Sequence, residues 1–143
     1  MQYNLNISGI EPFQIVRYLP GEKHPMHVDW LTDEELKAHP LSCPRLVSMF
    51  VYLSSDKIDE GEDELVGGET YFPEFPAVRE DADGTKFARA GNGATGLIVR
   101  PVPGNAMLWV NTKDKKGDDR TAHTGLEIVQ GVKRGMNILS YVC

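Results

Sequence analysis

Short runs of apolar and β-branched residues, separated by turn-forming residues, dominate the pattern along the chain. The clearest run is 46–53, in which Ser48, Phe50 and Tyr52 alternate with four apolar residues. Residues two apart share a face of a strand, so this alternation predicts a strand. Neither face is polar enough for open solvent, and we expect cover on both sides. Seven further strands are predicted at 13–18, 26–30, 68–72, 97–102, 106–110, 125–129 and 136–142.

Signals for helices are few. Thr32 stands three residues before Glu35, the spacing of a capping box, and predicts one or two helical turns over 32–37. Pro40 and Pro44 end this segment. Eight short strands with little helix favour a mainly β fold, a sandwich or jelly roll. No repeat or linker divides the chain, so we expect one domain over residues 1–143.

Composition is that of an ordinary globular protein, with 41% hydrophobic and 25% charged residues. The net charge of −6 argues against a nucleic-acid partner. Cys43 and Cys143 are too few for a disulfide framework and are expected to be reduced thiols. The sequence has no apolar signal core and no run of ~20 apolar residues. We therefore expect a cytoplasmic protein without membrane contact, unless a targeting segment has been removed.

Two histidines and one aspartate form a candidate metal site. His27 and Asp29 are two residues apart, so both side chains share a face if their segment is extended. His123 comes from a distant strand. Two imidazoles and one carboxylate are the ligands of a facial-triad iron(II) site, which keeps coordination positions open for a cosubstrate and oxygen.

The histidine pattern alone is weak, because a His-x-acid match is expected roughly once in two such chains by chance. The other two histidines are poorer candidates. His24 is expected in the turn before the strand, and His39 stands next to Pro40 in a polar segment.

Five segments in a fixed order give these residues their context. They are 18–21 (Tyr-Leu-Pro-Gly), 67–70 (Gly-Gly-Glu-Thr), 103–109, 119–126 and 131–133 (Gly-Val-Lys). In this order they resemble the prolyl 4-hydroxylase branch of the 2-oxoglutarate- and iron(II)-dependent oxygenases, over residues 13–142. The resemblance implies a double-stranded β-helix (jelly roll). It also implies an oxidoreductase, a dioxygenase that couples hydroxylation to release of succinate and CO₂.

The resemblance also implies where the metal and the cosubstrate bind. His27, Asp29 and His123 would hold Fe(II), which 2-oxoglutarate would chelate through its keto oxygen and proximal carboxylate. O₂ is the second cosubstrate, and ascorbate is a candidate reductant.

Four further residues are candidates for binding 2-oxoglutarate. Lys133 matches the family's cation for the distal carboxylate, which needs one because an unpaired charge in a dry pocket is very unfavourable. Thr70 matches the hydroxyl partner of the same carboxylate, and Tyr18 matches a tyrosine at the proximal end. Tyr52, on the inward positions of its strand, is a further candidate.

The substrate region departs from the family pattern. Arg134 follows Lys133 where many members have tryptophan, and Leu139 stands where another tryptophan often shapes the substrate site. We expect a peptide or amino-acid substrate, proline first. A nucleic-acid demethylase on the same barrel and a non-catalytic jelly-roll binding module are the alternatives. The acidic chain lacks the basic groove of the first, and the intact metal and lysine positions argue against the second.

Two regions outside the site carry further expectations. Segment 56–64 has six acidic residues and one lysine, which is typical of a solvated loop or, alternatively, a mobile lid. The long loop 79–96 has the same two interpretations. Family members usually carry helices before the first barrel strand, and this chain begins almost at that strand. We therefore expect a poorly covered sheet face, with marginal stability or self-association.

Overall fold

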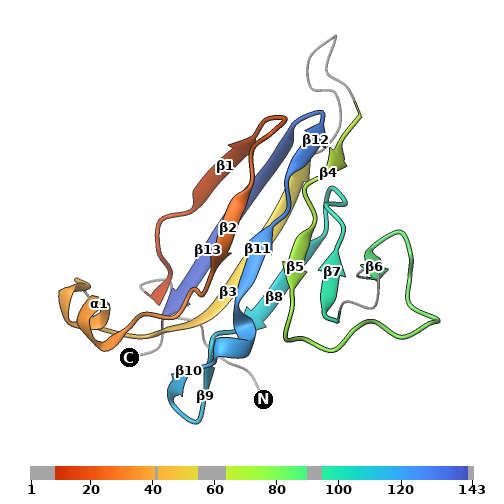
Figure 1. Cartoon of the computed structure of the whole chain (residues 1–143). Helices are drawn as coiled ribbons and strands as arrows, with labels where there is room; N and C mark the ends of the chain where they lie inside the picture. The colour runs from red at the N-terminus through yellow and green to blue at the C-terminus, as the bar shows by residue number, and fades with distance from the viewer. Residues whose placement is uncertain (1–8, 41, 55–63, 90–94, 142–143) are drawn as a thin grey trace.

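The chain folds into two facing antiparallel sheets, as the computed structural model shows (Figure 1). The described residues are 9–40, 42–54, 64–89 and 95–141. Across the main sheet the order is β1 (Gln14–Tyr18), β13 (Lys133–Tyr141), β3 (Arg45–Ser54) and β8 (Ala106–Val110). Across the second sheet the order is β2 (His24–His27), β11 (His123–Gly125), β5 (Thr70–Phe72), β7 (Leu97–Val99) and β6 (Phe87–Arg89).

Two short ribbons and one helix complete the described structure. The ribbons pair β4 (Val66–Gly67) with β12 (Ile128–Gln130), and β9 (Thr112–Lys113) with β10 (Lys116–Gly117). Helix α1 (Asp33–Ala38) has the predicted capping box, because Thr32 Oγ1 accepts from the Glu35 amide and Glu35 Oε2 accepts from the Thr32 amide. A short 3₁₀ turn, η2 (Asp119–Thr121), leads into β11.

The strongly alternating runs are confirmed as strands, whereas the shortest strands were not predicted. The run 46–53 lies within β3, and 106–110 is β8. The predicted strand 125–129 is divided between β11 and β12. Strands β6, β9 and β10 have two or three residues each, too few for a periodic pattern to be read.

The core lies between the two sheets and is largely aromatic. It is a buried cluster of Phe50, Tyr52, Phe72, Val99 and Trp109. Phe72 and Trp109 pack edge to face, with ring centroids 5.3 Å apart. Burying a large apolar side chain stabilises a fold by about 1.5–3 kcal/mol, so this cluster holds the two sheets together.

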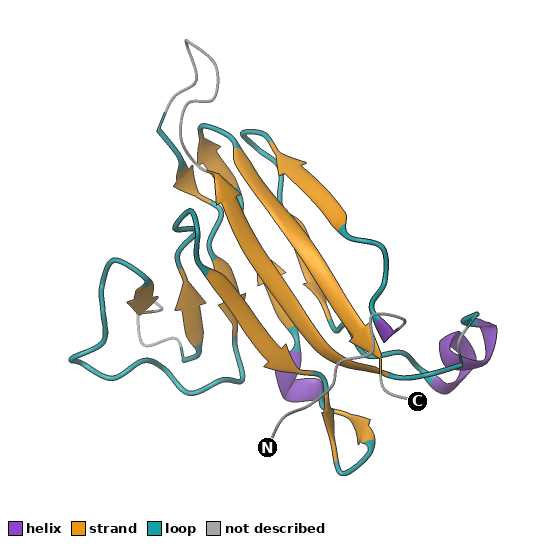
Figure 2. Ribbon diagram, turned by 180° about the vertical axis from the view of Figure 1, so that it is seen from behind, coloured by secondary structure: helices purple, strands orange, loops and turns teal. Residues whose placement is uncertain are grey.

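No described element covers the outer face of the main sheet (Figure 2). The expectation that β3 is covered on both sides is therefore wrong for the described part of the chain. Cross-strand pairs continue the apolar surface from Ile15 through Met136 to Val51, and from Met49 to Leu108. Ile15 is 66% exposed and Leu108 58%. A contiguous patch of this kind favours association.

We expect the protein to self-associate through this outer face, since pairing two such faces removes apolar surface from water at about 25 cal/mol per Å². The double variant Ile15→Lys/Leu108→Lys should stay monomeric where the parent associates, as measured by light scattering at increasing concentration. Val129→Lys is the control, because Val129 is also 66% exposed but lies on β12. Equal masses for the parent and the double variant at all concentrations would contradict the expectation.

The expectations for the cysteines, for membrane spans and for the two long loops have different outcomes. Cys43 is buried and disulfide-bonded, so the expectation of a reduced thiol is wrong for this residue. No helix among the described residues is long and apolar enough to span a membrane. Most of the acidic segment 56–64, and residues 90–94 of the second loop, lie outside the described residues, so the lid hypothesis for them stays a prediction.

Candidate active site

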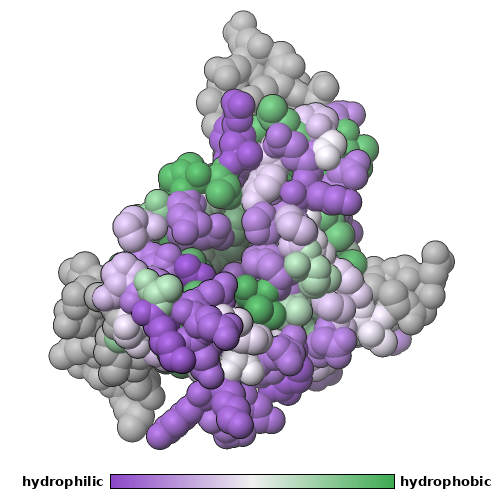
Figure 3. Space-filling model, turned by 60° about the vertical axis from the view of Figure 1, so that its left-hand side comes forward, coloured by the Kyte–Doolittle hydropathy of each residue, from purple (hydrophilic) through white to green (hydrophobic). Residues whose placement is uncertain are grey.

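A cavity of about 290 Å³ opens between the two sheets. On the face seen in Figure 3 the molecule is hollowed, and both hydrophilic and hydrophobic residues border the hollow. The cavity lining includes six of the seven residues predicted from the sequence: Tyr18, His27, Asp29, Thr70, His123 and Lys133. The fold thus brings together side chains from both ends of the chain.

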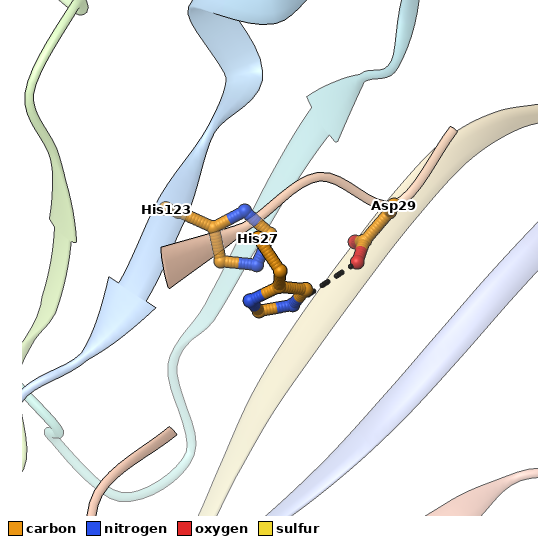
Figure 4. Close-up of side chains that lie close together, drawn as sticks. All are labelled: His27, Asp29 and His123. Atoms are coloured by element: carbon orange, nitrogen blue, oxygen red, sulfur yellow. Dashed lines mark ion pairs between the residues drawn. The ribbon is translucent and has the colours of Figure 1, made fainter. Parts of the chain in front are cut away.

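The three candidate metal ligands converge on one point (Figure 4). His27 on β2 pairs in register with His123 on β11, so the two imidazoles lie side by side with ring centroids 4.2 Å apart. Asp29 follows two residues after His27, just beyond the end of β2. One potential ligand atom from each residue lies within 4.8 Å of the others. The structure therefore brings the three candidate ligands together, and their role in binding a metal stays a prediction.

Hydrogen bonds to backbone carbonyls orient both imidazoles for metal binding. His27 Nδ1 lies 2.9 Å from the Pro25 carbonyl oxygen, and His123 Nδ1 lies 2.9 Å from the Thr121 carbonyl oxygen. A carbonyl can only accept, so each Nδ1 carries a proton, and in the neutral ring Nε2 is the nitrogen whose lone pair can bind a metal. These donors, with one carboxylate, fit a divalent iron ion.

The charge states at the cluster also fit a cation. Burial raises the pKa of Asp29, but hydrogen bonds with His27 and Ser48 outweigh it, so the net pKa of this carboxyl is lowered. Burial lowers the pKa of His123. Burial lowers the pKa of His27, but a hydrogen bond from protonated Nε2 to Asp29 Oδ1, 3.3 Å away, helps to raise it, and a bound metal ion would take the place of this proton. An ionised carboxylate and imidazole lone pairs leave a divalent ion only partly neutralised, so an anion can join it.

Lys133 places a buried cation in the same cavity. Its side chain is 3% exposed, and Nζ donates to the Gly68 carbonyl at 2.6 Å. Burial lowers the pKa of Lys133 to about 8, although the charge of Glu69 opposes this shift. Nζ also lies 5.0 Å from the Phe50 ring centroid. Among the described residues no carboxylate forms an ion pair with this ammonium, which is therefore available to an anionic ligand.

The paired glycines before Thr70 have a structural reason. Gly67 and Gly68 have φ angles of 86° and 75°, a region that favours glycine. A Cβ atom on Gly68 would lie 2.5 Å from Ile128 Cδ1 and 3.2 Å from Lys133 Cδ. Only glycine therefore lets this turn approach the lysine and offer it a carbonyl.

The hydroxyl candidates divide into two groups. Thr70 Oγ1 lies 2.8 Å from the Tyr52 hydroxyl, and burial raises the pKa of Tyr52 to about 12. A phenol that keeps its proton can donate to Thr70, whose own proton then serves a ligand. Tyr52 is thus behind Thr70, outside the cavity lining. Tyr18 lines the cavity directly, and its hydroxyl lies 3.4 Å from His24 Nδ1.

Sequence reasoning misplaced His24 and missed Arg45. His24 begins β2 instead of lying in a turn, lines the cavity, and packs edge to face on His27 with centroids 4.4 Å apart. Its side chain is not among the grouped metal ligands. Arg45 also lines the cavity and pairs with Glu11. In β3 the even-numbered residues point inward, so the alternation gave no signal for Arg45. This residue lies at the end of the strand where the pairing with β13 is irregular.

The two departures from the family pattern lie on opposite faces of β13. Leu139 is 8% exposed and lines the cavity, six residues along the same face from Lys133. Arg134 lies on the other face, opposite Arg17 of β1. Leu139 therefore makes one end of the cavity apolar, and Arg134 takes no part in the cavity lining.

Curated relatives of this chain are plant prolyl 4-hydroxylases. Prolyl 4-hydroxylase 1 of Arabidopsis thaliana is 33% identical over 125 residues, which is 86% of this chain and 38% of the relative. Prolyl 4-hydroxylase 2 of the same plant is 29% identical over 125 residues, again 86% and 38%. The chain thus spans less than two fifths of the length of these relatives. No known family profile matches it.

Solved structures with the same fold are also prolyl hydroxylases. A viral collagen prolyl hydroxylase from Paramecium Bursaria Chlorella virus-1, solved as a 2OG complex, superposes with a TM-score of 0.61 at 25% identity. The match covers 94% of this chain and 60% of the viral one. A Pseudomonas putida prolyl-4-hydroxylase shares the fold at 18% identity, with a TM-score of 0.54 and coverage of 94% and 55%.

The predicted fold class, mainly β with a double-stranded β-helix, is confirmed by these neighbours. The chain is prolyl 4-hydroxylase-like in sequence and in fold, which confirms the resemblance predicted from its motifs.

Proposed function

We propose that the chain is a 2-oxoglutarate- and Fe(II)-dependent hydroxylase acting on a peptide or amino-acid C–H bond, with proline as the first candidate. Succinate and CO₂ would be the products of the cosubstrate. The observation that carries the proposal is that the candidate metal ligands and a buried ammonium, which has no carboxylate partner among the described residues, line one cavity. The named activity of the relatives and the 2OG bound to the viral neighbour support it.

His27, Asp29 and His123 would hold the iron on one side. Iron bound in this way supplies oxygen activation at its open coordination positions. The protein's part is to fix the ligands: the two backbone-bonded imidazoles keep Nε2 directed at the cluster, and ionised Asp29 supplies the single negative charge. Trp109, 5% exposed and 4.8 Å from the His123 ring, keeps this side of the cavity dry.

Lys133 and Thr70 would bind the distal carboxylate of 2-oxoglutarate. Lys133 uses one proton on Gly68, which leaves two for the ligand. A charge-assisted hydrogen bond contributes about 1.5–3 kcal/mol, enough to select a dicarboxylate. Tyr18, which lines the cavity from β1, would contact the other end of the cosubstrate.

Turnover of 2-oxoglutarate tests the proposal. Purified protein with Fe(II), ascorbate and 2-oxoglutarate should release succinate, with stimulation by proline-containing peptides or free proline. Methylated oligonucleotides serve as the comparison, because the demethylase alternative predicts stimulation by them alone. Absence of succinate in every reaction, from protein that binds metal, would favour the non-catalytic module.

The affinity for 2-oxoglutarate should fall as pH rises above about 8, because only protonated Lys133 pairs with the carboxylate. The slope should approach about tenfold per pH unit. The negative charge of Glu69 acts against the lowering of the Lys133 pKa. The rings of Tyr18 and Tyr52 lie near Nζ. The folding stability of the ligand-free protein depends on pH in the opposite direction. Above about pH 8 Lys133 still binds a proton in the unfolded chain but loses it in the folded protein, so stability rises with pH.

Half-saturation by 2-oxoglutarate at saturating metal, measured between about pH 7 and 9, checks this expectation. The same series on Lys133→Ala is the control and should be nearly flat. A parent whose half-saturation also stays flat through this range would show that the ammonium does not face the carboxylate.

A further inference from the structure

The Phe50 ring divides the wall of the cavity that β13 forms. Alternate residues of a strand share a face, so the inner face of β13 carries, in order, Lys133, Gly135, Asn137 and Leu139. A Cβ atom on Gly135 would lie 2.2 Å from Phe50 Cζ, so glycine is what lets the ring lie over the strand at this point. Lys133 Nζ lies 5.0 Å from the centroid of the same ring. Phe50 thus separates the ammonium from Asn137 along this wall.

Two side-chain carboxamides line the cavity beyond Phe50. Gln14 of β1 pairs in register with Asn137 of β13, and both residues belong to the cavity lining. Neither carboxamide has a hydrogen-bond partner among the described residues. Asn137 is four residues from Lys133, which corresponds to about 13 Å along a strand. A cosubstrate bound between Lys133 and the metal cluster would therefore leave both carboxamides to a second ligand.

This end of the cavity adjoins the metal cluster and has its charge already compensated. Arg45 Nη1 donates to the Asp29 carbonyl oxygen at 3.3 Å, which ties this wall to the residue that carries the metal carboxylate. The Arg45 guanidinium itself forms an ion pair with Glu11. Leu139 is 8% exposed and adds an apolar surface. A ligand that binds here therefore meets amide and apolar groups.

A pair of carboxamides matches a main-chain peptide group. Each carboxamide offers a donor N–H and an acceptor C=O, which are the partners that the C=O and N–H of a peptide group need. A free amino acid would instead bring a carboxylate and an ammonium, and a charge without a partner is unfavourable away from water. The chemistry of this end therefore favours a neutral amide attached to an apolar side chain.

We propose that Asn137 and Gln14 form a subsite for a main-chain amide next to the residue that is hydroxylated, which selects a residue within a peptide over the free amino acid. The inference rests on the proposed function, since it assigns a class of substrate to that reaction. Asn137 is the main determinant, because it is half-buried, whereas Gln14 is exposed on the edge strand β1. A hydrogen bond between neutral groups contributes about 2- to 13-fold in affinity.

Succinate release with paired probes tests the inference. The probes are proline and the other amino acids, each as the free acid and as the N-acetyl N-methylamide, titrated at saturating 2-oxoglutarate. The parent should reach half-saturation at a lower concentration of the blocked form, and Asn137→Ala should reduce this preference by about 2- to 13-fold. Half-saturation by 2-oxoglutarate should stay parental, because Lys133 is unchanged. Asn137→Asp should reduce the preference further, since its carboxylate loses the amide donor and attracts the ammonium of the free acid.

Ser140→Ala is the matched control, because it removes a polar group from the outer face of the same strand and should keep the parental preference. If Asn137→Ala does not fold, Asn137→Asp decides alone, since it preserves the side-chain volume. A parent that uses free acids as well as blocked ones, or a folded Asn137 variant with the parental preference, would overturn the inference and leave the proposed function intact. A parent that releases no succinate with any probe would reject the proposed function, and the inference with it.

Discussion

Asp29→Ala is expected to abolish tight Fe(II) binding and 2-oxoglutarate turnover together. Asp29 supplies the one carboxylate of the cluster, and its lowered pKa keeps it ionised at neutral pH. Without it, two imidazoles face a divalent ion with no compensating negative charge. The loss should exceed the roughly 10- to 100-fold effect of an orienting partner, because a ligand itself is removed. Anaerobic calorimetry with Fe(II) measures the first effect and succinate release the second.

Asp33→Ala is the matched control for this variant. Asp33 is four residues along the chain, exposed, and in the first turn of α1, so its loss removes the same charge without touching the cavity. This control should bind Fe(II) and release succinate as the parent does. Iron affinity in Asp29→Ala equal to that of Asp33→Ala would reject the metal assignment, whatever happens to turnover.

Local periodicity sufficed for the parts of the fold and site that depend on neighbours in sequence. The two-residue spacing of His27 and Asp29 placed both side chains on one side, although Asp29 lies just outside the strand. Alternation in 46–53 correctly put Ser48, Phe50 and Tyr52 on the inner face. Such features need only the geometry of an extended backbone.

Features that depend on pairing between distant strands were not predictable. The hydrogen bond between Ser48 and Asn111 requires β8 to lie beside β3, a register that no local pattern encodes. His24 enters the cavity because β2 pairs with β11 from its first residue. The apolar outer face gave the wrong prediction for β3, because periodicity shows that a face is apolar and not whether anything covers it.

The second large effect concerns Lys133. Lys133→Ala should raise the 2-oxoglutarate concentration for half-saturation by roughly 10- to 150-fold, the equivalent of about 1.5–3 kcal/mol. Lys133 is 3% exposed and has no carboxylate partner among the described residues, so its charge is available to the ligand. Iron affinity should stay near the parental value, since Lys133 is not part of the metal cluster.

A discrimination experiment separates this role from general damage to the cavity. The parent should bind 2-oxoglutarate much more tightly than a 2-oxo monocarboxylate of similar length, because only the dicarboxylate reaches the buried ammonium. In Lys133→Ala this preference should disappear, whereas in Lys113→Ala, which removes an exposed lysine on β9, it should persist. A variant that bound both acids more weakly but kept their ratio would point to cavity collapse, and parental half-saturation would remove Lys133 from the site. The ratio is the informative quantity because metal chelation is common to both acids and cancels from it, which leaves only the interaction at the distal end.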